Sequence, residues 1–181
     1  MLYLLCGVIS FAAFFIYDLN SVKFHIKSLH LLFAAGCAVL AAATAVCLWR
    51  EYRGQVAMGF ALAAAGFFGL MIYTLFFALP FADTYAAQGK PALCDRGMYA
   101  LCRHPGVLWF CLMYGCLGLA WGSPGVWLTG TVYSLLNIAY VIFQDLWTFP
   151  QTFDGYGAYR KSTPFLIPTP KSLCRALKTR P

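Results

Sequence analysis

The chain has 181 residues, of which 61% are hydrophobic and only 10% are charged. Soluble domains carry about 25% charged residues, so this composition excludes a water-soluble globular protein and indicates a chain embedded in a membrane. The net charge of +7 does not indicate nucleic-acid binding, because no soluble basic module accompanies it; basic loops beside a membrane account for it.

Hydropathy predicts an all-α, polytopic membrane protein that forms a single domain over residues 1–181. A helix needs about 20 apolar residues to cross a bilayer. Five stretches approach or exceed that length, at about Leu2–Tyr17, Leu29–Trp49, Val56–Phe81, Pro105–Trp121 and Val126–Trp147. The first three occupy residues 1–82, and the first is expected to be a retained helix rather than a signal peptide. The turn at residues 122–125 makes the last two an antiparallel hairpin.

Basic residues are distributed unequally between the two sides of this arrangement. With five spans, the first loop, the third loop and the C-terminal segment share one side, which holds eleven Lys and Arg residues. The opposite side holds only Arg50 and Arg53. Because basic residues favour the cytoplasmic side, we expect the N-terminus outside and the C-terminal segment in the cytoplasm.

The eight cysteines predict no metal site. The sequence contains no C-x-x-C pair, and the spacing of Cys94, Cys102 and His104 matches no zinc pattern. We therefore expect reduced thiols and no bound metal.

The stretch 97–105 is the first candidate functional region. Pro105 suits the first turn of a helix and favours an extended conformation for the residue before it. Arg103 and His104 are therefore expected at the mouth of the fourth helix, a position that attracts a carboxylate. The alternative is that Arg103 is one more cytoplasmic basic residue and His104 an interfacial one.

The second candidate region ends the fifth helix. Asp145 is the only acidic residue inside a predicted span, a costly position that requires a partner or a function. The alternative is that it lies at the interface near Trp147 and faces water. A polar stripe upstream either lines a cofactor pocket or forms hydrogen bonds between helices; it consists of Tyr133, Asn137, Tyr140 and Gln144.

Together these regions resemble the isoprenylcysteine carboxyl methyltransferase and phospholipid methyltransferase superfamily of membrane enzymes. In that family Gly-x-Tyr-x-x-x-Arg-His-Pro precedes a helical hairpin, an acidic pair ends it, and Tyr-x-x-Tyr and Pro-x-x-x-Pro follow. The resemblance covers about residues 88–170. The matching residues are Gly97, Tyr99, Arg103, His104, Pro105, Asp145, Tyr156, Tyr159, Pro164 and Pro168. Two positions depart from the pattern, since Val107 replaces a tyrosine and Gln144 replaces the first acidic residue.

The resemblance implies methyl transfer from S-adenosylmethionine to a lipid or lipidated acceptor, a carboxylate or an amine, taken from the bilayer. It implies catalytic roles for Arg103, which holds the methionine carboxylate, and for His104. The implied cofactor-binding residues are Tyr99, Arg103, His104, Gln144, Asp145, Tyr156 and Tyr159.

The hairpin adds a geometric expectation, because two helices of similar length return the chain to the face it left. Arg103, His104, Asp145 and the segment 156–159 are therefore expected to converge on one pocket, large enough for an adenosine and open sideways to lipid. Two other functions remain open: a sterol or steroid reductase-like membrane enzyme that uses NADPH, and a small membrane protein without enzymatic activity.

Overall fold

A computed structural model describes residues 2–78 and 93–179, and all the regular secondary structure in these ranges is helical. Four helical stretches are long and apolar enough to cross a membrane, and a fifth apolar helix is shorter. The four are Leu2–Phe24, Lys27–Arg50, Met58–Phe76 and Pro124–Thr152, and the shorter one is Pro105–Trp121. The chain therefore has the make-up of a multi-pass membrane protein, as the sequence predicts.

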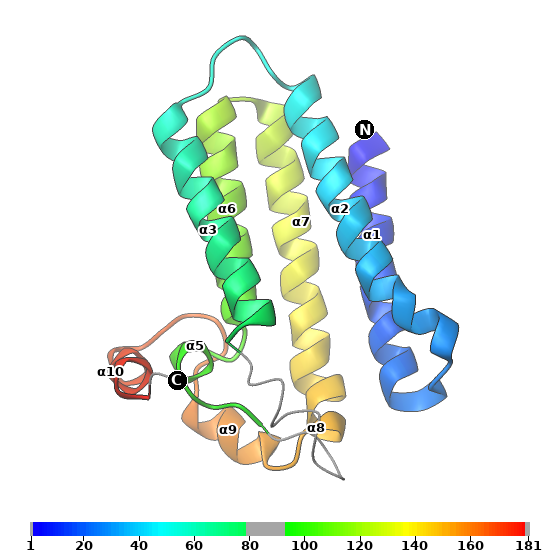
Figure 1. The fold of residues 1–181 in the computed structure, drawn as a ribbon, viewed down its shortest axis with the longest axis vertical. Helices are drawn as coiled ribbons and strands as arrows, with labels where there is room; N and C mark the ends of the chain where they lie inside the picture. The colour runs from blue at the N-terminus through cyan, green and yellow to red at the C-terminus, as the bar shows by residue number, and fades with distance from the viewer. Residues whose placement is uncertain (1, 79–92, 180–181) are drawn as a thin grey trace.

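The long helices run side by side (Figure 1). They are α1 (Leu2–Leu19), α2 (Leu31–Arg50), α3 (Met58–Phe76), α6 (Pro105–Trp121) and α7 (Pro124–Phe143). The α3 helix packs mainly on α6, α1 packs on α2, and α7 contacts both α6 and α1.

Shorter helices gather at the end of the bundle that lies away from the N-terminus (Figure 1). They are α5 (Met98–Leu101), α8 (Phe149–Thr152), α9 (Tyr156–Ser162) and α10 (Pro170–Lys178). Three further turns extend the long helices at the same end: η1 (Asn20–Phe24), η2 (Lys27–His30) and η3 (Gln144–Thr148). Both candidate functional regions therefore lie at this end.

Local sequence signals explain the α6–α7 hairpin. Pro105 begins α6, where its missing N–H costs nothing. Gly122 ends it in a left-handed conformation with φ of 59°, which glycine adopts without strain. Ser123 then caps α7, its side chain accepting a hydrogen bond of 3.2 Å from the backbone N–H of Gly125. The predicted antiparallel hairpin is confirmed.

The first and last spans are longer than predicted. The first was expected to end at Tyr17, but α1 continues to Leu19 and the π-helical turn η1 extends it to Phe24. Asp18 therefore lies inside a candidate span, and the prediction that Asp145 is the only acidic residue in one is wrong. The predicted third span runs to Phe81, of which residues 79–81 lie outside the described residues.

At the opposite end of the bundle, the side chain of Glu51, the residue after α2, connects neighbouring helices. Its carboxylate accepts hydrogen bonds from the hydroxyls of Ser123 and Tyr3. The bond from Ser123 lowers the pKa of Glu51. The carboxylate also fills the space beside Gly125, where an added Cβ would lie 2.3 Å from the Glu51 Cδ. One side chain thus joins α2 to the start of α7.

Candidate functional site

The segment before α6 is held by backbone pairing with the chain beyond α9. The N–H of Arg103 donates to the carbonyl of Pro164 at 2.9 Å, and the N–H of His104 donates to that of Phe165 at 3.3 Å. The backbone just before Pro105 is free for this pairing because proline disfavours a helical conformation there. The segment that contains Arg103 and His104 is therefore in direct contact with the segment that contains Pro164 and Phe165.

Asp145 lies at the centre of the site and is 3% exposed. Its Oδ1 atom lies 2.9 Å from the Nε atom of Arg103, and its Oδ2 accepts a 3.3 Å hydrogen bond from Nη2 of the same guanidinium. The hydroxyl of Tyr156 donates to Oδ1 at 2.6 Å. The Nε2 atom of His104 lies 3.4 Å from Oδ1, and the Nε atom of Arg160 lies 3.3 Å from Oδ2. The alternative in which Asp145 faces water is wrong.

Arg103 is almost completely withdrawn from solvent, with 9% of its side chain exposed. Besides its ion pair, its Nη1 atom donates to the backbone carbonyls of Arg160 at 2.6 Å and Thr163 at 3.1 Å. Its guanidinium carbon lies 5.5 Å from the ring centroid of Phe165, within the range of a cation–π contact. Arg103 is thus a buried, oriented cation and not a surface basic residue.

His104 is enclosed by aromatic rings. Its imidazole stacks on Phe149, with centroids 5.6 Å apart, and meets Phe165 edge-on at 5.1 Å. Burial lowers the pKa of His104, although the nearby Asp145 carboxylate acts in the opposite direction. The neutral imidazole is therefore favoured at neutral pH.

The predicted tyrosines divide into two groups. Tyr156 bonds directly to Asp145, and burial raises the pKa of its hydroxyl. Tyr159 instead donates to the backbone carbonyl of Tyr99 at 2.7 Å. Tyr99 donates to the carbonyl of Thr74 at 3.0 Å. Tyr159 and Tyr99 therefore link α9, α5 and α3 and brace the site from one side.

Gln144 is turned away from this cluster. Its Nε2 atom donates to the hydroxyl of Tyr140 at 2.9 Å, and the side chain lies close to the buried Asp18. The hydroxyl of Thr148 donates to Asp18 at 3.3 Å. Adjacent residues thus separate into two clusters, with Asp145 facing Arg103 and Gln144 facing α1.

The polar stripe on α7 contacts other helices. The Tyr133 hydroxyl donates to the backbone carbonyl of Tyr3 at 2.5 Å. Tyr140 and Gln144 both face Asp18, which belongs to α1 as Tyr3 does. Of the two interpretations left open by the sequence, hydrogen bonding between helices describes Tyr133, and Tyr140 and Gln144 also face a neighbouring helix.

A cleft of about 430 Å³ lies beside the cluster. Arg103 forms part of its wall, whereas His104, Asp145 and Tyr156 do not line it. The remaining walls come from the end of α9, the segment 163–169 and the start of α10. The convergence of Arg103, His104, Asp145 and Tyr156 is therefore observed, but this cavity lies on one side of Arg103 and not between the four residues.

Two contributors to the site were not singled out from the sequence. In the sequence, Arg160 is only one of the basic residues of the C-terminal segment, and no motif includes Phe149. One signal was present for Arg160: it lies four residues after Tyr156, so both occupy one face of a helix. In the part of the chain that the structure describes, no group of three or more His, Cys, Asp or Glu side chains could hold a metal ion.

Comparison with known proteins found no matching family model, no matching curated protein and no matching solved structure. The functional assignment therefore depends on the sequence pattern and on the geometry described above.

Proposed function

We propose that this chain is an integral membrane methyltransferase that uses S-adenosylmethionine, with the Asp145 cluster as its cofactor site. The observation that supports this most is the convergence of residues distant in sequence. Arg103 and Asp145 are 42 positions apart and share two contacts. His104 and Tyr156 reach the same carboxylate. All four belong to the pattern that resembles the methyltransferase superfamily.

The charges at the site suit the amino-acid end of this cofactor, which carries one carboxylate and one ammonium. Arg103 is a fixed cation for the carboxylate, and Asp145 is a fixed anion for the ammonium. Asp145 already contacts four side chains through hydrogen bonds or ion pairs, so one of them must yield. Arg160 is the candidate, because 45% of its side chain is exposed and exposed ion pairs contribute little. The adjoining cleft of about 430 Å³ falls within the usual size of small-molecule sites.

When bound, S-adenosylmethionine supplies an electrophilic methyl group, and the electron pair of the broken carbon–sulfur bond stays on sulfur as the acceptor takes the methyl. The residues of the chain orient the reactants and exclude water. His104 has a second role if the acceptor is an amine, since a neutral imidazole can accept the proton that an ammonium must lose. A carboxylate acceptor needs no such base.

We infer the orientation from the positions of the basic segments. The first loop, the segment 93–104 and the tail lie at the same end of the bundle (Figure 1). The linker between α2 and α3, with Arg50 and Arg53, lies at the other. The end that carries α10 is therefore proposed to be cytoplasmic. There the site has access to a cytosolic cofactor and to a lipidic acceptor from the bilayer.

The orientation predicts the behaviour of a topology reporter. A reporter that is active only in the cytoplasm should be active when fused after Pro181, and one that is active only outside should be silent. After Gly54, in the linker on the other side, the two reporters should give the reverse result. An active external reporter after Pro181 contradicts the proposed orientation.

Cofactor binding tests the proposed function. The full chain in detergent should bind S-adenosylmethionine in calorimetry and transfer a labelled methyl group into a lipid extract. Tyr156→Phe removes a hydrogen bond to a buried carboxylate, so we expect roughly tenfold weaker binding. The matched control is Tyr52→Phe, on an exposed side chain, with unchanged binding. Absence of binding to the unmodified chain contradicts the proposal.

A reductase that uses NADPH is the second candidate, and the cleft favours it. Five cationic side chains line that cleft, and NADPH carries several phosphates. NADPH binding without S-adenosylmethionine binding selects the reductase. Binding of neither selects a non-enzymatic membrane protein.

A further inference from the structure

The cleft beside Arg103 is strongly cationic. Its lining contains five basic residues and no acidic residue: Arg103, Arg160, Lys161, Lys171 and Arg175. They come from the segment before α6, from α9 and from α10, so three separate parts of the chain bring positive charge to one cavity. Bringing like charges together costs free energy unless an anion compensates it.

Asp145 compensates only part of this charge. It pairs with Arg103 and Arg160. Among the residues that the structure describes, Lys161, Lys171 and Arg175 have no carboxylate within ion-pair distance. Three cations therefore face the cleft without a counter-charge from the described chain.

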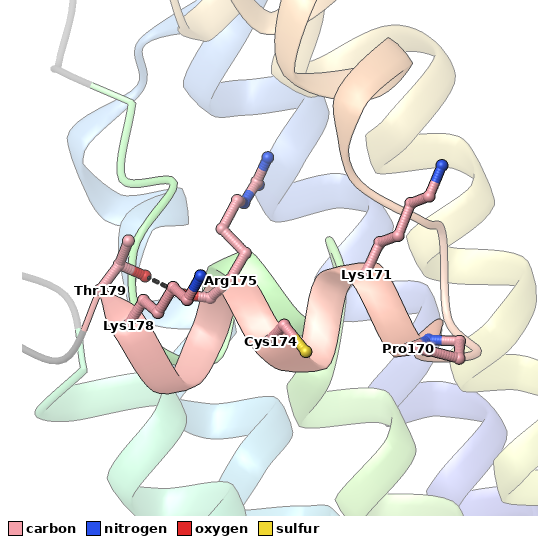
Figure 2. A pocket seen from close by; sticks show the side chains of 6 residues that line it. All are labelled: Pro170, Lys171, Cys174, Arg175, Lys178 and Thr179. Atoms are coloured by element: carbon pink, nitrogen blue, oxygen red, sulfur yellow. Dashed lines mark hydrogen bonds between the residues drawn. The ribbon is translucent and has the colours of Figure 1, made fainter.

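Arg175 provides a second, independent indication of a ligand. Its Nη2 atom donates to the hydroxyl of Thr163 at 2.5 Å, which fixes the guanidinium at the cleft. Its Nε atom is buried and has no hydrogen-bond partner among the described residues. A buried donor without an acceptor is rare and requires an explanation. Figure 2 shows that the side chains of Arg175 and Lys171 extend from the same side of α10.

We propose that this cleft binds a phosphate group. A phosphate offers several acceptor oxygens and up to two negative charges, which suits clustered arginine and lysine side chains. A single carboxylate, such as that of S-adenosylmethionine, leaves most of the cationic charge uncompensated. This site goes beyond the proposed methyl transfer and does not depend on it.

The phosphate belongs either to a lipid headgroup or to a soluble molecule. Figure 1 shows α10 nearly end-on, so its axis lies across the direction of the spans. The helix is amphipathic, with Leu173 and Leu177 exposed on the side away from its basic residues. Such helices lie at membrane surfaces, which would place the cleft at the level of lipid phosphates.

The test uses the full chain in a maltoside detergent, which contains no phosphate. Inorganic phosphate and dioctanoyl phosphatidic acid are titrated separately, with chloride keeping the ionic strength constant, and calorimetry measures both affinities. Lys171→Gln should weaken phosphate binding about tenfold, the usual scale for one charged contact. Lys171 is exposed, so this variant should fold normally.

Lys178→Gln is the matched control. Lys178 lies on the same helix and borders a shallow hollow along α10 (Figure 2), but it does not line the cleft. Its substitution should change the affinity less than about twofold, as expected for a distant screened charge. Equal weakening by both variants, or no binding of either ligand, overturns the proposal.

The two ligands identify the source of the phosphate. Much tighter binding of phosphatidic acid assigns the cleft to a lipid headgroup, and equal binding assigns it to a soluble phosphate. S-adenosylmethionine is titrated into the unmodified chain in a separate experiment. Phosphate binding without S-adenosylmethionine binding therefore removes the methyltransferase proposal and leaves this one intact.

Discussion

Asp145→Asn should lower the free energy of unfolding by roughly 3–5 kcal/mol, the usual cost of removing one member of a buried ion pair. The carboxylate is 3% exposed and is the only acidic partner within reach of the guanidinium of Arg103 among the described residues. The substitution leaves that guanidinium buried without a counter-charge. Tyr156 also loses its 2.6 Å bond to a charged acceptor. Equilibrium unfolding of the full chain in mixed micelles measures the change.

Two further variants separate the ion pair from a general effect of the substitution. Asp95→Asn makes the same chemical change on an exposed side chain and should stay within about 0.5 kcal/mol of the unmodified protein. Arg103→Gln combined with Asp145→Asn should cost less than the sum of the two single changes, because neither charge is then left alone. Additive losses would show that the two residues do not stabilise each other.

The sequence predicts helix boundaries best where a residue carries a backbone signal. The α6 helix spans the predicted residues, because Pro105 begins it and Gly122 ends it. The first span was predicted too short, because hydropathy falls at Asp18 and Asn20. The chain remains helical there since both polar side chains are satisfied. Asn20 exchanges two hydrogen bonds with the backbone of Ile26, and Asp18 accepts one from the hydroxyl of Thr148 in η3.

The approach of Arg103 to Asp145 followed from the similar lengths of α6 and α7. The direction in which the Gln144 side chain points could not be predicted from these helix lengths. Gln144 and Asp145 both lie in the π-helical turn η3, where consecutive side chains point in different directions, so the two residues face different neighbours. A motif that treats the two as one pair does not show this separation. The packing of the segment after α9 against residues 103–104 could not be predicted either. The pairing of Arg103 and His104 with residues 164–165 is made by backbone atoms, which carry no sequence signal.

The contact between α1 and α7 depends on a residue that no functional motif includes. Gly7 faces the ring of Tyr133, which is fully buried. A Cβ added at Gly7 would lie 2.0 Å from the Tyr133 Cε1 and 2.2 Å from its Cζ. The ring has little freedom to withdraw, because its hydroxyl is bonded to the carbonyl of Tyr3 and Tyr114 packs against it at 5.7 Å.

Gly7→Ala should therefore destabilise the protein by about 3 kcal/mol, at the upper end of the range for overpacked interiors. The loss should appear even though alanine favours a helix over glycine by about 1 kcal/mol. Gly66→Ala, in α3 with no atom within 4 Å of the added Cβ, is the control and should be neutral or stabilising. Tyr133→Leu removes the ring edge that the new methyl meets. In that background Gly7→Ala should cost much less, because the methyl then occupies space that the ring has vacated. The same loss in both backgrounds would show that the α1–α7 contact does not depend on the close approach of Gly7 to Tyr133.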